Sequence, residues 1–290
     1  MHCLSQASLG NNGRLGNQLF QYAAMKCLSL HKCVPMVLPE GEHRLNDFQI
    51  KAYSAPIKQI IGIVQSPQVH TYNEPHFHYD ENFFKLPLQL QTVNLHGYFQ
   101  SPKYFQDIDH IIRKELTIAS PSRRKYIEEY IQNIRDKYPN KSIVSLHNRR
   151  GDNVPIQGEA HQDKIGGNFL PDKEKYHPLL SDEYLSKSMK MFDNCVFLVF
   201  SDSQKDIDWC KNNIEGENLL FSEGHDDITD FGLQSACDHN IVANSSFSWW
   251  SAYLNDNPDK VVVAPKSRWF GPGLAHHNLK DLFPEEWKLL

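Results

Sequence analysis

The sequence predicts an α/β protein with two similar halves, each folded around a parallel sheet. From Cys195 onward, short runs rich in β-branched and aromatic residues alternate with amphipathic stretches, a pattern typical of strands joined by crossover helices. Near the N-terminus, a glycine turn at 13–17 opens a run of apolar residues at helical spacing. A chain of 290 residues is long enough for one large or two medium domains.

The second half carries the more regular pattern. Apolar runs predict strands at 142–146, 195–200, 218–221, 239–243 and 260–264. Amphipathic stretches predict helices at 204–212, 230–237 and 247–254. Because polar residues follow the strands, we expect a ligand site at the carboxyl ends of this sheet, where open α/β sheets bind ligands.

The first half is less regular. Apolar residues predict a helix behind the glycine turn, at positions 19, 20, 23, 24, 27 and 28, and a second helix with Tyr104, Phe105, Ile108, Ile111 and Ile112 on one face. Strands are expected at 34–38 and 93–98. A charged helix at 122–137 is ended by Pro139, and a boundary there gives domains 1–139 and 140–290. Residues 154–178 mix Gly, Pro, His and charges, as long functional loops do.

Composition and charge disfavour several classes of protein. Thirty Lys and Arg against 35 Asp and Glu give a net charge of −5, without a basic stripe for a nucleic-acid partner. The N-terminus has no charged leader, and no apolar run approaches the ~20 residues of a membrane span, so we expect a cytoplasmic protein. The six cysteines form no C-x-x-C pair, which favours buried thiols over a disulfide scaffold or a zinc site.

Two adjacent arginines at a predicted strand end give the sharpest functional signal. Residues 147–152 read HNRRGD, so Arg149 and Arg150 follow the strand at 142–146 closely. Guanidinium groups are costly to bury without an anion, but they match phosphate oxygens in bidentate geometry and keep their charge. They can therefore take the place of a divalent cation on a diphosphate. The alternative is a surface salt-bridge cluster with Asp152.

Two further segments offer anion sites at helix starts. Residues 13–21 read GRLGNQLFQ; the glycines permit a tight turn and the helix start presents free amides, although an ordinary helix start gives the same pattern. Residues 244–250 read NSSFSWW, with hydroxyls and amides at a strand-to-helix turn. Here the alternative is simple N-capping by Asn244 or Ser245. The adjacent tryptophans fit sugar stacking or core packing.

Taken together, these segments resemble the alpha-1,2-fucosyltransferases of glycosyltransferase family 11. The family's recurring blocks look like residues 13–24, 97–101 (GYFQS), 147–152 and 230–250, in the family's order and across nearly the whole chain. The resemblance implies two Rossmann-like domains in a GT-B arrangement, the first mainly for the acceptor and the second for GDP-fucose. It also implies inverting transfer of L-fucose, without a metal or other cofactor, to the 2-hydroxyl of a terminal galactose of a glycan.

Residue by residue, the resemblance implies which groups hold the diphosphate. Arg150, helped by Arg149, would grip the donor pyrophosphate, with Arg14 and Asn17 reaching from the first domain. Negative charge builds on the departing GDP, and fixed arginines aimed at that charge stabilise it. The departure of GDP would then need no metal ion.

The same resemblance implies the nucleotide-reading groups. His147 and Asp230 would read the guanine, because a carboxylate can accept both the ring N–H and the amino group. Ser245, Ser246 and Phe247 would line the phosphate side. The family usually has Ser-Thr where this chain has Ser245-Ser246, a conservative change.

The acceptor base is left open. Asp152 and Glu159 are candidates because they stand beside and after the arginines, although either could simply brace an arginine. The expected partners are GDP-fucose and a galactose-terminated glycan, in oligosaccharide or O-antigen synthesis. Peripheral contact with a membrane-bound acceptor is compatible with this expectation.

Other functions compete with this interpretation. A metal-dependent transferase would use an Asp-x-Asp pair, and two occur at 107–109 and 206–208; both fall in expected helices, where residues two apart point to different faces. Another GDP-sugar transferase, or a non-catalytic glycan- or nucleotide-binding module, is also compatible with the arginine pair. The histidine pairs at 76/78 and 276/277 lack partners at a known metal-ligand spacing.

Overall fold

The computed structural model describes residues 2–41, 43–64, 69–88, 91–150 and 173–290. The chain divides into two compact units, Met1–Ala119 with His277–Pro284, and Ser120–His276 with Glu285–Leu290. The sequence placed the boundary near Pro139, after the charged helix, whereas the structure divides the chain ahead of it. The reason is that this helix, α4 (Pro121–Lys137), packs against α8 (Asp227–Ala236) of the second unit.

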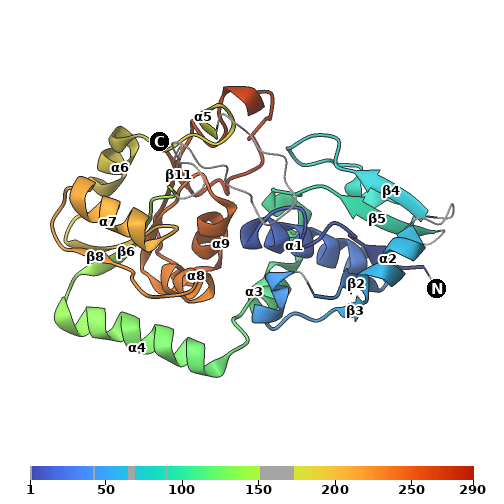
Figure 1. Cartoon of the computed structure of the whole chain (residues 1–290), viewed down its shortest axis with the longest axis horizontal. Helices are drawn as coiled ribbons and strands as arrows, with labels where there is room; N and C mark the ends of the chain where they lie inside the picture. The colour runs from blue at the N-terminus through green and yellow to red at the C-terminus, as the bar shows by residue number, and fades with distance from the viewer. Residues whose placement is uncertain (1, 42, 65–68, 89–90, 151–172) are drawn as a thin grey trace. The chain divides into compact units, whose positions relative to one another are not determined.

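The described residues of the first unit form a five-stranded parallel sheet in the order β3-β2-β1-β5-β4 (Figure 1). Its strands are β1 (Leu4–Ser5), β2 (Met36–Pro39), β3 (Tyr53–Ala55), β4 (Val69–Asn73) and β5 (Thr92–His96). Helix α1 (Leu15–Lys32) joins β1 to β2. Its apolar residues at positions 19, 20, 23, 24, 27 and 28 are fully buried, which confirms the face predicted from their spacing.

Shorter helices complete this unit. They are α2 (Ile57–Val64), α3 (Asp109–Glu115), and the 3-10 helices η1 (Arg44–Asp47), η2 (Phe83–Lys85), η3 (Pro102–Tyr104) and η4 (Gln106–Ile108). The single helix expected across 104–112 is wrong, because η3, η4 and α3 replace it. Phe105 breaks the run: its φ of −146° and ψ of 2° leave the helical range, while its side chain is fully buried.

The described residues of the second unit form a six-stranded parallel sheet in the order β11-β10-β9-β6-β7-β8. Its strands are β6 (Ser142–His147), β7 (Cys195–Phe200), β8 (Leu219–Phe221), β9 (His239–Ile241), β10 (Val262–Ala264) and β11 (Lys288–Leu289). The helices, besides α4 and α8, are α5 (Lys173–Tyr176), α6 (Asp182–Met189), α7 (Gln204–Asn213), α9 (Ser246–Leu254) and the 3-10 helix η6 (Pro272–Leu274). None of the helices in the described ranges is both long and apolar enough to cross a bilayer.

The predicted elements of the second half are confirmed to within a few residues at their ends. Helix starts follow the capping rules: Ser120, Ser181, Ser203 and Asp226 each accept a hydrogen bond from a first-turn amide of α4, α6, α7 and α8. The loop expected at 154–178 falls largely outside the described residues, and its described end contains α5.

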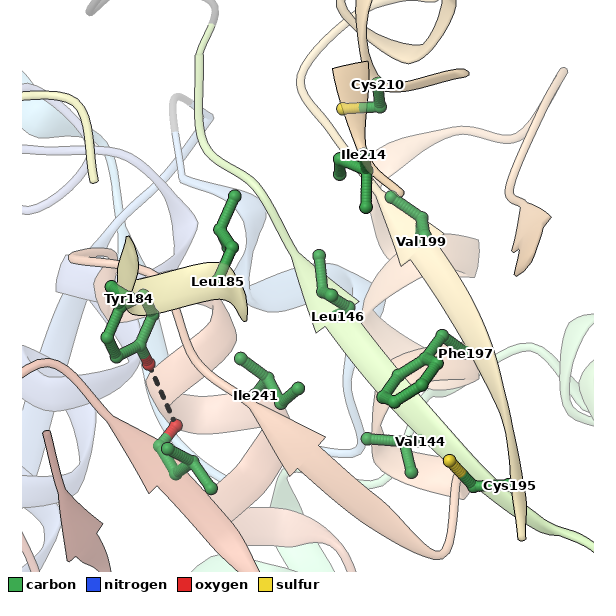
Figure 2. Close-up of a cluster of buried hydrophobic side chains, with 11 residues drawn as sticks. Val144, Leu146, Tyr184, Leu185, Cys195, Phe197, Val199, Cys210, Ile214 and Ile241 are labelled. Atoms are coloured by element: carbon green, nitrogen blue, oxygen red, sulfur yellow. Dashed lines mark hydrogen bonds between the residues drawn. The ribbon is translucent and has the colours of Figure 1, made fainter. Parts of the chain in front are cut away.

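Helices cover both faces of the second sheet. Strands β7 and β8 follow β6 on one side of it in the sheet, whereas β9 and β10 lie on the opposite side of β6. Since parallel crossovers are right-handed, α6 and α7 cover one face and α8 and α9 the other. Figure 2 shows the core under α6 and α7, where Tyr184, Leu185 and Ile214 meet strand residues such as Leu146. The Tyr184 hydroxyl donates to the backbone oxygens of Val242 and Val263, at 2.7 and 3.2 Å.

The thiols are unpaired and mostly buried, as expected. All six cysteines are free, and Cys27, Cys195, Cys210 and Cys237 are buried. Burial raises the pKa of the Cys27 thiol to about 12. Thiols of this kind are packing groups rather than nucleophiles.

Candidate functional site

The second sheet has a topological switch point between β6 and β9. These neighbouring strands are parallel, with Val144 opposite His239 and Leu146 opposite Ile241, so their carboxyl ends share one edge. After β6 the chain passes to the face of α6, and after β9 it passes to the face of α9. Open α/β sheets bind ligands in the crevice that such diverging loops create. The residues after both strands are therefore the first candidates for the site.

Arg149 links the two sides of this switch point. Its Nη1 donates to the backbone oxygen of Asn244 at 3.0 Å. Asn244 is itself fixed, because its buried side-chain amide donates to the backbone oxygens of Pro178 at 2.7 Å and Arg268 at 3.0 Å. The guanidinium of Arg149 is thus held at the start of the β9–α9 turn.

The β9–α9 turn carries the predicted serines. Ser245 is the N-cap of α9, yet its hydroxyl makes no capping bond within the described residues, so N-capping does not explain why a hydroxyl stands there. The first amides of α9 face out of the helix start, where they and the helix dipole favour an anion. Ser246 and Phe247 follow directly in the first turn of α9. Phe247 packs against His147 and Phe231, with ring centroids 6.0 and 5.4 Å apart.

Arg150 contacts a different set of groups. Its guanidinium carbon lies 3.3 Å from the ring centroid of Trp209 on α7, and its Nε is 3.9 Å from a carboxylate oxygen of Asp206. Its backbone amide donates to Asp202 at 2.8 Å. Burial lowers the pKa of the Arg150 guanidinium, which still stays ionised at any working pH. The two adjacent arginines are therefore divided between α9 and α7.

Asp230 lies on α8, close to the end of β8. Its Oδ1 accepts a hydrogen bond from the Ser222 hydroxyl at 2.6 Å and lies 3.5 Å from Nδ1 of His225. Burial raises the pKa of Asp230 to about 6, while the Ser222 hydrogen bond and the nearby His225 lower it. Below that pH the protonated carboxyl group offers a ligand fewer acceptor positions than the carboxylate does.

The remaining predicted donor contacts lie in the first unit. Arg14 is the N-cap residue of α1, and Asn17 Oδ1 accepts a hydrogen bond from Gln100 Nε2 at 2.9 Å. Gln21 Nε2 bridges the backbone oxygens of Asn12 and Gly97, at 3.0 and 3.1 Å. The segments 13–24 and 97–101, far apart in the sequence, thus meet at the carboxyl ends of β1 and β5. This edge is the switch point of the first sheet, because the chain runs from β1 to β2 on one side of β1, whereas β5 lies on the other side of β1.

Two predicted residues, Asp152 and Glu159, lie outside the described residues. Sequence reasoning missed Ser222, His225 and Trp209, which contact Asp230 and Arg150. Ser222 and His225 follow a predicted strand, so the rule that ligand sites gather at strand ends could have found them.

The Asp-x-Asp pairs have separate partners. Asp206 accepts from the Ser203 hydroxyl, whereas Asp208 accepts from Gln204 at 3.0 Å. In the other pair, Asp109 binds Arg113 at 2.8 Å and Asp107 lies 3.5 Å from His31. The two carboxylates of each pair therefore contact different groups.

Comparison with known proteins adds independent findings. A family model described as glycosyl transferase family 11 matches residues 5–289. O-antigen biosynthesis glycosyltransferase WbnK of Escherichia coli is 28% identical over 95% of this chain and 97% of its own. Alpha-1,2-colitosyltransferase of Escherichia coli is 28% identical over 95% of both chains. Galactoside alpha-(1,2)-fucosyltransferase 1 of Homo sapiens is 26% identical over 87% of this chain and 66% of its own.

Among solved structures, POFUT1 in complex with GDP matches with a TM-score of 0.50 at 15% identity, over 90% of this chain and 97% of that chain. At this identity the likeness concerns the fold alone. Together with the two parallel sheets, it confirms the predicted fold class, α/β with two Rossmann-like domains of the GT-B type.

Proposed function

The chain belongs to glycosyl transferase family 11, as its resemblance predicted, and on this premise we propose that it transfers L-fucose from GDP-fucose to the 2-hydroxyl of a terminal galactose. Relatives named as an alpha-1,2-colitosyltransferase and a galactoside alpha-(1,2)-fucosyltransferase support the linkage. The name of a third relative supports a role in O-antigen biosynthesis.

The observation that carries this proposal is the position of Arg149. Its guanidinium is held over the start of α9 by the Asn244 backbone oxygen, at the switch point of the donor-side sheet. A diphosphate there would meet a fixed cation and the amides of a helix start, the two features that anion sites combine. Ser245 and Ser246 supply hydroxyl donors at the same turn. We therefore assign the donor diphosphate to this turn.

We rank Arg149 above Arg150 as the diphosphate-binding arginine, because Arg149 is held at the β9–α9 turn. Arg150 is stacked on Trp209 and lies near Asp206, so its charge is already partly compensated by α7. We assign Arg150 the role of fixing the chain end after β6, which in turn orients Arg149. The family resemblance implied the opposite order, with Arg150 as the main diphosphate contact and Arg149 helping it.

We assign the guanine to Asp230, and we keep His147 as a second guanine contact, as the resemblance implied. Above pH about 6 the Asp230 carboxylate is ionised and can accept both the ring N–H and the amino group of guanine. His147 is the last residue of β6 and packs against Phe247, so it lies at the carboxyl-end edge of the second sheet. Arg14 and Asn17 stay predicted donor contacts of the first unit.

The reaction follows from the linkage change. The donor carries fucose in a β linkage, so an acceptor oxygen that attacks C1 from the opposite face gives the α product in one displacement. The bond from C1 to the diphosphate oxygen breaks, and its electron pair leaves with GDP. The proton of the acceptor hydroxyl passes to a base, for which Asp152 and Glu159 remain the candidates. Arg149 and the α9 amides stabilise the charge on GDP, so we propose turnover without a metal ion or cofactor.

A donor screen tests this function. The full chain is incubated with GDP-fucose, GDP-mannose or UDP-galactose and a galactose-terminated acceptor, with excess EDTA or with Mg²⁺. We expect a fucosylated product from GDP-fucose alone, at the same rate in EDTA. Metal-dependent turnover would overturn the arginine mechanism, and GDP binding without any product would favour the non-catalytic binding module.

A different donor sugar is the second candidate. It is favoured by the similarity to an alpha-1,2-colitosyltransferase, whose transferred sugar differs by name from fucose. GDP-activated colitose in the same screen separates the two: preferential transfer of colitose would keep the diphosphate site and replace fucose as the substrate.

A further inference from the structure

Four polar side chains form a continuous chain of contacts that ends at Asp230. The hydroxyl of Tyr126, on α4, lies 2.8 Å from Nε2 of His225. Nδ1 of His225 lies 2.8 Å from the Ser222 hydroxyl oxygen, and that hydroxyl donates to Asp230 Oδ1 at 2.6 Å. These residues come from α4, from the β8–α8 connection and from α8, so the contacts join three segments of the second unit.

The number of hydrogens fixes the direction of this chain when Asp230 is ionised. A serine hydroxyl has one hydrogen, and Ser222 gives it to Asp230. Ser222 must therefore accept a hydrogen from Nδ1 of His225. A neutral His225 with its hydrogen on Nδ1 can then accept at Nε2 from the Tyr126 hydroxyl. Every donor and acceptor in the chain is satisfied, with each bond pointing toward Asp230.

The end of the chain leaves capacity for a ligand. Asp230 Oδ2 bonds none of the residues that the structure describes, and Oδ1 uses one of its lone pairs for Ser222. The side chain of Asp230 is 18% exposed, so it is neither sealed in the core nor free in solvent. A partly buried carboxylate that is held at one oxygen and open at the other can bind a planar group with two N–H donors.

Other charged and titratable groups surround this carboxylate. Those from the packed elements are Arg123, Tyr126 and Tyr130 on α4, Glu223 and His225 before α8, and Asp226 and Asp227 at the start of α8. Arg123 is engaged with Asp226 at 2.8 Å. Helix α9, which also packs on α8, has no charged residue in its sequence. The nearest hydrogen-bonding support for an ionised Asp230 thus comes from Ser222 and His225.

We propose that Tyr126, His225 and Ser222 are positioning residues that hold Asp230 ionised and oriented for guanine. The inference rests on the proposed function, because it takes guanine as the ligand of Asp230. Ser222 fixes one carboxylate oxygen, His225 fixes Ser222, and Tyr126 sets the tautomer of His225. A protonated or rotated Asp230 would lose one or both acceptor positions, and with them the preference for guanine over bases that lack the amino group.

Nucleotide binding measures this preference directly. GDP and IDP carry the same diphosphate and ring N–H, and IDP lacks only the amino group, so the ratio of their Kd values reports the amino contact. Titration of the phosphates affects both ligands and largely cancels in the ratio. In the unaltered protein we expect IDP to bind about 10-fold more weakly than GDP at pH 7.5, the scale of one lost hydrogen bond to a charged group.

The variants are Ser222→Ala, His225→Gln and Tyr126→Phe. Loss of Ser222 or His225 removes a contact that lowers the pKa of Asp230, so the pH below which GDP binding weakens should rise from about 6. We expect the IDP-to-GDP ratio to fall to about 2-fold in Ser222→Ala and His225→Gln, since the amino contact contributes much less once the carboxylate is free or protonated. Tyr126→Phe should lower the ratio less, because it acts through His225.

The matched control is Tyr130→Phe. Tyr130 lies on the same helix with its ring 5.3 Å from that of His225, but its hydroxyl has no partner among the described residues. It should keep the ratio and the pH profile of the unaltered protein. The far-UV circular dichroism of each variant is checked alongside.

The outcomes distinguish a failure of the proposed function from a failure of this inference. Absence of GDP binding in the unaltered protein overturns the proposed function and this inference with it. GDP binding with an unchanged IDP-to-GDP ratio and pH profile in folded Tyr126→Phe and His225→Gln overturns only the positioning role of Tyr126, His225 and Ser222. If Ser222→Ala fails to fold, the comparison of Tyr126→Phe with Tyr130→Phe still tests this positioning role, because these variants differ only in which hydroxyl is removed.

Discussion

Arg149 donates a hydrogen bond to the backbone oxygen of Asn244, a residue 95 positions further along the chain. The bond joins the loop after β6 to the turn after β9, so it fixes a cation at the edge where the two loops diverge. A guanidinium carries five N–H donors, and this bond uses one of those of Arg149.

Arg149→Lys should reduce kcat/KM by about 10²-fold or more, the scale for loss of one preorganised donor to a developing charge. Lysine keeps the charge but cannot hold Asn244 and a phosphate oxygen in the same fork. Arg150→Lys is the matched variant, and we expect a smaller loss because a lysine can still lie on Trp209 near Asp206. Steady-state kinetics of both variants decide the matter. Equal losses, or a larger one at position 150, would reverse the ranking of the two arginines.

Asp230→Ala should raise the Kd for GDP by about 10-fold or more while the rate at saturating donor changes little, since base contacts are similar in ground and transition states. Asp226→Asn is the control: it removes a charge one turn earlier but keeps a capping side chain for α8. Isothermal titration with GDP and initial rates at saturating GDP-fucose measure the two effects. An unchanged Kd in the folded Asp230→Ala protein would remove Asp230 from the site.

Glu74 should make the first unit less stable as the pH rises toward 7. Its carboxylate follows β4 and accepts from the amides of Tyr98 at 2.7 Å and Phe99 at 3.0 Å. Burial raises its pKa from the ordinary 4.5 to about 7. Because the folded pKa is raised, the stabilising contribution is complete below 4.5 and is lost as the pH rises through about 7, by about 3 kcal/mol in all at ~1.4 kcal/mol per unit.

In Glu74→Gln this part of the pH dependence should disappear. Urea denaturation at pH 5 and pH 8 gives the two free energies of unfolding, and the exposed Glu81→Gln is the control for a lost surface charge. Parallel curves for Glu74→Gln and the unaltered protein would show that Glu74 does not titrate in this range.

Gly13→Ala should destabilise the protein by about 2 kcal/mol or more, because two costs combine at this position. Gly13 has a φ of +94°, and a Cβ there would clash with the Asn17 side-chain nitrogen. Gly41→Ala separates the costs, since Gly41 has a φ of +104° but no heavy atom within 4 Å of a Cβ. Thermal unfolding of both variants should show the larger loss at Gly13. A loss no greater than that of Gly41→Ala would mean that Asn17 moves aside freely.

The sequence predicted those elements whose apolar period is strong. Helix α1 and strands β6 and β7 are buried on the residues that their spacing marks. Strand β1 was missed because its two residues are too few to show a period, and β3 and β4 because their side chains are mostly exposed. Phe105 was misassigned because its spacing is helical, while tertiary packing gives its backbone another conformation.

The candidate site could be predicted where it follows a strand end, as at Arg149 and Ser245, whose roles in donor binding stay predictions. The different contacts of Arg149 and Arg150 could not be predicted from the sequence. Neighbouring side chains in an extended segment point to different sides, and only the packed structure shows which groups lie on each side. Tyr126 could not be connected to Asp230 from the sequence, since 99 positions separate Tyr126 from His225 and only the packing of α4 on α8 brings them together.

The division of the chain has a consequence for how such proteins can be recombined. The chain passes from one unit to the other after Ala119, returns after His276 and leaves again after Pro284. Residues 277–284 supply Asp281, which binds Lys103 at 2.7 Å in the first unit, and the residues after them supply β11 to the second sheet. A chimaera that exchanges the second unit between relatives therefore needs three junctions, and a single crossover after Ala119 would leave the first unit with residues 277–284 from the other parent.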